Sequence, residues 1–152
     1  MKIAIMGAGF VGESLGRALV KAGHEVMLSS RTPQSDRMQA LSADLGNAAR
    51  VGTVQETLAF SDVVAMALRS DAVADVVHKA GDWSGKVVLD MTQGDLTTVA
   101  GLETARIVKI FNSIGAEHYQ NPDFAGQPAS MLYCGDDDAA RIIAAGLARD
   151  LG

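Results

Sequence analysis

The chain has 152 residues, which suits one domain with a single buried core, because a domain of that size buries roughly 70% of the surface that its unfolded chain exposes. With 48% apolar and 20% charged residues, the composition is typical of a globular protein and excludes a disordered or fibrous chain. The formal net charge of -5 argues against nucleic acid as a partner, since a nucleic-acid-binding protein needs a basic face.

Cysteine usage and the amino-terminal segment narrow the class of protein further. The single cysteine, Cys134, cannot form an intramolecular disulfide, and no Cys/His cluster has the spacing of metal ligands. The apolar run at residues 2–6 is interrupted at Gly7, well short of a signal peptide or a membrane span. We therefore expect a cytoplasmic protein with no bound metal and no membrane partner, and we interpret residues 2–6 as a first strand.

Short apolar runs recur along the chain and alternate with helical patterns. The runs are nearly continuous rather than strictly alternating, as in strands that are covered on both faces. They lie at residues 2–6, 25–29, 62–68, 86–91, 106–111 and 130–134.

Helical periodicity separates several of these runs. Apolar residues from Val11 to Ala22 recur at three- and four-residue spacings, which predicts a helix that ends at Gly23. Further helices are predicted at residues 38–45, 72–80 and 137–150, the last with an acidic start at residues 136–138 that is typical of a helix cap. The alternation predicts an α/β fold in one domain, residues 1–152: a Rossmann-type, doubly wound and mainly parallel sheet with its ligand at the carboxyl ends of the strands.

A glycine-rich loop, GAGFVG, follows the first strand directly and opens the first helix. It fits the dinucleotide-binding pattern G-x-G-x-x-G, in which Gly7 permits the tight turn, Gly9 lets the backbone approach a pyrophosphate and Gly12 lets the helix pack on the strand. Phe10 and Val11 lie within the loop and shape it or the core. The alternative is a glycine-rich turn that holds no ligand.

The end of the second strand carries hydroxyls and a cation where an NAD enzyme would have a carboxylate. Ser30, Arg31 and Thr32 stand at the position that reads the adenosine ribose, whereas Glu25 lies at the far end of the strand. Hydroxyl donors and a guanidinium suit a terminal 2′-phosphate, so the segment favours NADP(H) over NAD(H). The alternative is a solvated arginine in a polar loop. Arg37 is a second candidate for positive charge here, although we expect it to face water on the next helix.

No acid–base pair or nucleophile stands out in the sequence. His24 and His78 are interpreted as structural or solvated, Cys134 as a core residue, and His118 as the one histidine near the expected pocket. We therefore assign no catalytic residue. Direct hydride transfer between two bound rings needs chiefly proximity and orientation, so the absence of a proton donor favours that chemistry over carbonyl reduction.

With GAGFVG, SSR, KIFNSIG and YCGDDDAA in this order, the whole chain resembles the NADP oxidoreductases that depend on the deazaflavin coenzyme F-420, a family fold that recurs in the reductase domain of the STEAP metalloreductases. The resemblance implies hydride transfer from NADPH to the deazaflavin in a homodimer. It matches Gly7 to Gly12 with the pyrophosphate loop and Ser30 and Arg31 with the 2′-phosphate pair.

The same resemblance implies that Leu68 and Arg69 lie near the nicotinamide, although family members often have a proline there, and that the acceptor pocket begins at residues 112–119. Family members usually extend some tens of residues beyond the position of Gly152, and that segment helps to build the dimer and the acceptor site. We therefore expect a dimer that binds NADPH well and reduces deazaflavin poorly.

Two functions remain open from the sequence. In the first, an oxidoreductase transfers hydride between NADPH and a small-molecule acceptor, either coenzyme F-420, a flavin or a similar redox compound. In the second, a non-catalytic NADP(H)-binding module senses redox state or serves a partner.

Overall fold

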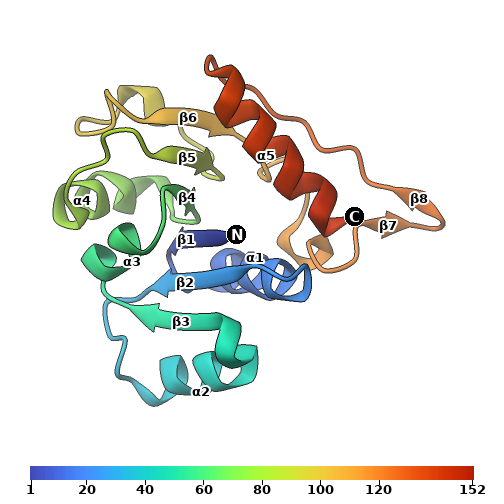
Figure 1. The fold of residues 1–152 in the computed structure, drawn as a ribbon, viewed down its shortest axis with the longest axis horizontal. Helices are drawn as coiled ribbons and strands as arrows, with labels where there is room; N and C mark the ends of the chain where they lie inside the picture. Colours follow the sequence, from blue (N-terminus) through green and yellow to red (C-terminus); the bar gives the residue numbers. More distant parts are fainter.

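Six parallel strands form the central sheet of the protein, whose structure is a computed structural model that describes residues 1–152 (Figure 1). Their order across the sheet is β3-β2-β1-β4-β5-β6, so that the chain first builds outward from β1 to one side and then from β4 to the other. The strands are β1 (Lys2–Met6), β2 (Glu25–Ser29), β3 (Ala49–Gly52), β4 (Val63–Met66), β5 (Val87–Asp90) and β6 (Arg106–Lys109).

Helices connect these strands and cover both faces of the sheet. They are α1 (Phe10–Lys21), α2 (Asp36–Leu45), α3 (Val54–Phe60), α4 (Ser70–Ala80) and α5 (Asp138–Leu151), with short 3-10 turns η1 (Gly46–Ala48), η2 (Leu96–Thr98) and η3 (Ala116–His118). Asp137 caps α5 by accepting a hydrogen bond from the amide of Ala140, as the acidic start predicts. None of these helices combines the length and the apolar composition that crossing a bilayer requires.

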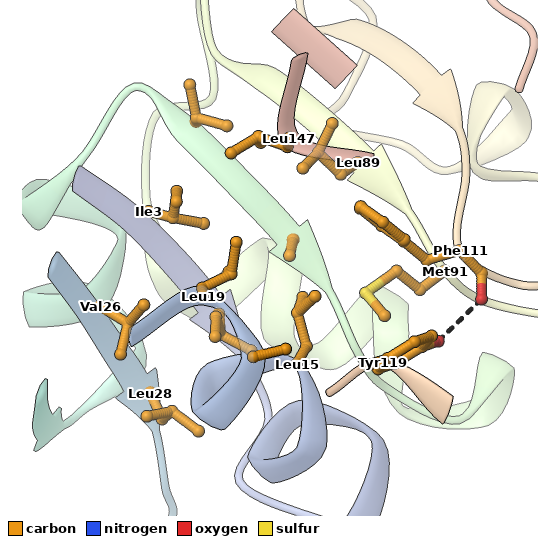
Figure 2. Packing of buried hydrophobic residues seen from close by; sticks show 14 of the residues in the cluster. Ile3, Leu15, Leu19, Val26, Leu28, Leu89, Met91, Phe111, Tyr119 and Leu147 are labelled. Carbon is orange, nitrogen blue, oxygen red and sulfur yellow. Dashed lines mark hydrogen bonds between the residues drawn. The ribbon is translucent and has the colours of Figure 1, made fainter. Parts of the chain in front are cut away.

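The strands pack on both faces because their side chains alternate. In β1, Ile3 and Ile5 face one hydrophobic cluster, which α1, α2 and α5 cover, whereas Ala4 and Met6 face a second cluster under α3 and α4. Figure 2 shows part of the first cluster around β1, β2 and β5, with labelled contributions from α1 and α5. Burial on both faces explains the nearly continuous apolar runs and confirms the predicted doubly wound α/β fold.

Two expectations about the strands are wrong. Residues 130–134 form no strand: the segment between β8 and α5 runs alongside α5 (Figure 1), and it meets β6 only through a single antiparallel bridge between Cys134 and Lys109. Leu132, Tyr133 and Cys134 are exposed, so Cys134 is not a core residue. The sixth strand is instead β3, whose four residues, Ala-Arg-Val-Gly, carry too weak an apolar pattern to be predicted.

The carboxyl-terminal part also contains a small hairpin that the sequence did not predict. Strands β7 (Asp123–Phe124) and β8 (Gln127–Pro128) pair in antiparallel fashion beside the end of α5 (Figure 1). The predicted strands at residues 62–68, 86–91 and 106–111 are present but shorter, and their last residues form the loops at the carboxyl edge of the sheet.

Candidate functional site

The sheet order places a crevice at the carboxyl ends of β1 and β4, where successive connections diverge to opposite sides. Gly7 follows β1 and approaches the end of β4 closely: a Cβ atom at Gly7 would lie 2.6 Å from the carbonyl oxygen of Ala67, and Gly7 itself has a φ of +109°. Only glycine adopts that conformation without strain in such a confined place. The first glycine of the motif therefore makes the tight turn that the sequence predicts.

The second and third glycines face opposite environments. A Cβ at Gly12 would lie 2.0 Å from the carbonyl oxygen of Gly7, so the start of α1 packs directly on the loop. A Cβ at Gly9 would meet no atom within 4 Å, so the backbone there is open to the outside. Open backbone at Gly9 with tight packing at Gly12 is the arrangement that a pyrophosphate-binding loop requires.

The start of α1 leaves backbone donors for an anion. Gly9 is the N-cap residue and offers no side-chain cap, and the first intrahelical bond is donated by Glu13 to the carbonyl of Gly9 over 2.8 Å. The amides of Phe10, Val11 and Gly12 precede that bond, so they have no partner within the helix. Unpaired amides at the positive end of a helix dipole are the features that bind anions. The Phe10 side chain is 67% exposed and Val11 lies at the surface beside it.

A serine that the sequence analysis missed holds the glycine loop in place. The Oγ of Ser29, the last residue of β2, accepts a hydrogen bond from the amide of Gly7 over 2.9 Å, and the side chain is buried. The bond ties the loop after β1 to the end of the neighbouring strand. The only signal in the sequence is a hydroxyl at the end of an apolar strand.

The predicted ribose-reading segment lies at the carboxyl end of β2. Ser30 continues the sheet by donating its amide to the carbonyl of Gly52, and its Oγ accepts a hydrogen bond from the amide of Thr32 over 3.1 Å. Arg31 and Thr32 are exposed. Glu25 lies at the opposite end of β2, as predicted, so no carboxylate of β2 is close to this segment.

Arg37 stands closer to the glycine loop than the sequence analysis expects. It lies in the first turn of α2, and its Nη2 donates to the carbonyl oxygen of Ala8 over 3.1 Å and lies 3.5 Å from Oε2 of Glu13. The side chain is still 64% exposed, so the expectation that it faces water is right only in part. The guanidinium of Arg37 therefore lies beside the glycine loop, close to the carboxylate of Glu13.

The two residues after β4 behave differently. Leu68 is half-buried, and its Cδ2 would lie 3.0 Å from a Cβ at Gly7, so this side chain forms part of the wall beside the loop. Arg69 is the N-cap residue of α4 and its side chain, 86% exposed, pairs with Asp71 over 2.9 Å. The structure thus brings Leu68 to the predicted site, whereas the Arg69 side chain is directed to solvent.

The loop after β6 has an unusual backbone conformation. Phe111 is buried and adopts a φ of +66°, and its carbonyl oxygen accepts a hydrogen bond from the hydroxyl of Tyr119 over 2.7 Å (Figure 2). Burial of the phenol, with a smaller contribution from the charge of Glu117, raises the pKa of Tyr119 to about 12. Tyr119 is therefore a structural hydrogen-bond donor at neutral pH.

No histidine forms part of an acid–base pair at the carboxyl edge of the sheet. His118 lies in η3 with its ring 4.7 Å from that of Phe124, and His78 is exposed on α4. His24 is buried at the opposite end of β2, with its Nδ1 3.1 Å from the amino group of Met1. We therefore assign no catalytic role to these three histidines.

Strand order, glycine loop and ribose-reading segment together define a dinucleotide-binding protein of the Rossmann type. Within that class the chain belongs to the coenzyme F420-dependent NADP oxidoreductase family, whose model matches residues 2–94. This family membership confirms the resemblance inferred from the motifs and makes the chain a member of an NADP-dependent oxidoreductase family.

Individual relatives are similar over different shares of their length. The chain is 28% identical to the metalloreductase STEAP3 of Rattus norvegicus over 99% of its own length and 32% of that protein, and 23% identical to 2-hydroxy-3-oxopropionate reductase of Escherichia coli K12 over 84% of its own length and 42% of that protein. It therefore spans less than half of each of these two relatives. A candidate F420-dependent NADP reductase from Arthrobacter sp. FB24 shares the fold over the whole chain and 81% of its own, with a TM-score of 0.86 and 23% identity.

Proposed function

We propose that this protein is an NADP(H)-binding oxidoreductase that transfers hydride between NADPH and a deazaflavin, a flavin or a similar small-molecule redox acceptor. One observation carries the proposal. The backbone of the glycine loop is closely packed at Gly12 and accessible at Gly9, and the neighbouring strand β2 is followed by hydroxyls and a guanidinium instead of a carboxylate. These are the features that a dinucleotide with a 2′-phosphate needs.

The residues divide the work of binding between them. The open amides at the start of α1 suit the pyrophosphate, and Ser30, Arg31 and Thr32 suit the 2′-phosphate. Arg37 adds positive charge beside the glycine loop. Leu68 provides an apolar wall next to the loop, on the side where the second half of the dinucleotide would lie.

Bound NADPH would supply the hydride, and the chain would supply orientation and the exclusion of competing reactions. The lack of a histidine or carboxylate pair at the carboxyl edge of the sheet supports direct transfer to an acceptor that needs no positioned proton donor. The family description favours a deazaflavin as the acceptor. The Asn112 to Tyr119 segment, held by the hydrogen bond between Tyr119 and Phe111, is our candidate for the start of the acceptor pocket.

Calorimetric titration with NADPH and with NADH tests the cofactor. We expect NADPH to bind at least about tenfold more tightly, because a charge-assisted hydrogen bond contributes about 1.5–3 kcal/mol. Equal affinities would contradict the proposal. Oxidation of NADPH in the presence of F-420 or a flavin then separates an enzyme from a non-catalytic NADP(H)-binding module, which would bind the cofactor and catalyse neither reaction.

His118→Ala is the variant that tests direct transfer. Its turnover should stay within an order of magnitude of the unmodified protein, because the His118 ring lies tilted against that of Phe124 and the carboxylate of Glu117, 3.9 Å from its Nε2, is beyond hydrogen-bond distance. A loss beyond roughly a hundredfold, the scale of general acid–base catalysis, would show that a proton donor is required.

The proposal includes a homodimer in the cytoplasm. Leu132, Tyr133 and Ile142 are exposed, at 72%, 45% and 70%, on α5 and on the segment that runs along it, which gives a second copy an apolar surface to cover. The exposed thiol of Cys134 suits a reducing compartment. Sedimentation equilibrium measures the assembly, and a strict monomer would remove the dimer from the proposal.

A further inference from the structure

A lysine ammonium group binds the loop after β5 from the neighbouring strand. The Nζ of Lys109, at the end of β6, donates to Oδ2 of Asp90 over 3.0 Å, to the carbonyl oxygen of Thr92 over 2.5 Å and to that of Gly94 over 2.7 Å. An ammonium group has three donors, so all of them are engaged within the protein. Lys109 therefore has no free proton to offer a ligand, and its effect is on the loop that it holds.

Asp90, the last residue of β5, holds the same loop through its side chain. The side chain is buried, and its Oδ1 accepts hydrogen bonds from the amide of Thr92 over 2.8 Å and from the Oγ1 of Thr92 over 2.7 Å. Thr92 Oγ1 accepts in turn from the amide of Gly94 over 3.2 Å. The aspartate, the lysine and the loop thus form one connected hydrogen-bond network at the carboxyl end of β5.

The loop lies beside the second half of the crevice. A Cβ at Gly94 would lie 3.2 Å from the Oγ of Ser70, the first residue of α4, so the loop packs against the helix that follows β4. Leu68, just before that helix, reaches the glycine loop. In a doubly wound sheet the first three strands carry the adenosine half of a dinucleotide and the last three carry the other half, so the Thr92–Gly94 loop borders the nicotinamide side.

We propose that Lys109 is a positioning residue that sets the wall of the nicotinamide half by fixing the carbonyl groups of Thr92 and Gly94. The inference rests on the proposed NADP(H) function. It goes beyond that function because it makes binding of one half of the dinucleotide depend on a residue whose donors are all engaged within the protein. Gln93 lies between Thr92 and Gly94 and is exposed, so Lys109 would fix the backbone on both sides of it and thereby the orientation of its side chain.

The test compares two ligands that share one half. Adenosine 2′,5′-bisphosphate carries the adenosine, the 2′-phosphate and one phosphate of NADPH, and it has no nicotinamide. The variant Asp90→Asn/Lys109→Gln removes both charges together, so no unpaired charge is left in the core. Glutamine is shorter than lysine, so the substitution introduces no steric clash at the groove that Lys109 borders.

A matched control exists at the amino end of β5, the strand whose carboxyl end carries Asp90. Lys86 Nζ donates to Asp62 Oδ1 over 2.8 Å and to the carbonyl oxygen of Ser61 over 3.0 Å, at the amino end of β5 and away from the crevice. Asp62→Asn/Lys86→Gln makes the same chemical change there. Thr92→Val is a milder variant of the loop itself, because it removes the hydroxyl that bridges Asp90 and Gly94 and leaves every charge in place.

We expect Asp90→Asn/Lys109→Gln to lower the affinity for NADPH by about tenfold or more, because the loss of one well-placed hydrogen bond to the nicotinamide half corresponds to about a tenfold change. The affinity for the bisphosphate should change by less than about threefold. Thr92→Val should shift the affinity ratio in the same direction, and the control pair should leave it unchanged. An unchanged ratio in the first variant, or in Thr92→Val if the first does not fold, would overturn the inference. Failure of the unmodified protein to bind NADPH would instead overturn the proposed function.

Discussion

The carbonyl oxygen of Gly7 occupies the place where a side chain at Gly12 would begin. A Cβ atom at Gly12 would lie 2.0 Å from that oxygen, far inside the contact distance of the two atoms, and Gly12 is buried in the first turn of α1. No flexible side chain can move to relieve this contact, so the backbone would have to shift. Gly9 differs because its Cβ would meet nothing within 4 Å. One motif therefore contains a glycine needed for packing and a glycine needed for access.

Alanine substitutions at these two positions should separate stability from binding. Gly12→Ala should lower the free energy of unfolding by about 1–3 kcal/mol or more, the usual cost of overpacking. The free energy of unfolding of Gly9→Ala should stay within about 1 kcal/mol of the unmodified protein, because the extended backbone at Gly9, with a φ of -85°, suits alanine. Its affinity for NADPH should fall by at least about tenfold. Urea unfolding and calorimetry measure the two effects. Full NADPH binding by Gly9→Ala would show that no ligand approaches this part of the backbone.

Arg31→Ala should lower the affinity for NADPH and leave the affinity for NADH nearly unchanged. The exposed guanidinium at the end of β2 would lose a charge-assisted contact with the 2′-phosphate, which corresponds to about a ten- to hundredfold change in affinity. Arg50→Ala removes another exposed arginine, on β3, and serves as the control. An equal loss for both dinucleotides would mean that Arg31 binds something other than the 2′-phosphate.

Tyr119→Phe should destabilise the protein by about 1–3 kcal/mol, because it leaves the buried carbonyl of Phe111 without a donor. Tyr133→Phe, at a phenol that is 45% exposed, should stay within about 0.5 kcal/mol in the same urea titration. Equal effects of the two substitutions would show that the bond to Phe111 contributes little.

The same tyrosine predicts a response to alkaline pH. The pKa of Tyr119 is raised from its ordinary value of 10.0 to about 12, so its stabilising effect is complete below pH 10 and is lost as the pH rises toward 12. The stability difference between the unmodified protein and Tyr119→Phe should therefore shrink over that interval. A constant difference would exclude ionisation of Tyr119 as the cause.

His24 predicts a loss of stability in acid. Burial, followed by the positive charge of the amino terminus, lowers the pKa of His24, while Asp150, whose Oδ2 is 3.2 Å from Nε2 but makes no aligned hydrogen bond, opposes the shift only in part. A lowered pKa in the folded state means that the contribution is complete above about pH 6.5, the ordinary value, and decreases as the pH falls below it. Thermal unfolding should show this decrease, Asp150→Asn should steepen it, and His24→Gln should flatten it. A slope unaffected by His24→Gln would assign the acid response to other groups.

Local sequence patterns determined the class of fold and the positions of the glycine loop and of the segment that follows β2. Burial on both faces makes a strand apolar throughout, and the turn from β1 into α1 needs glycine at fixed positions, so both features are visible in neighbouring residues. Ser30 and Arg31 were predictable for the same reason, because their distance from the loop follows from the length of one helix and one strand.

The tertiary structure alone decided which distant residues meet. Ser29 binds Gly7 across 22 residues, Arg37 binds Ala8 across 29, and Lys109 binds Asp90 across 19. Each contact depends on which strands become neighbours, and no periodicity in the chain records that order. The errors at β3 and at residues 130–134 have the same origin: the weakly apolar β3 pairs with β2 over four residues, while the more apolar segment meets the edge strand β6 at one bridge, so apolar pattern alone did not decide which segment joins the sheet.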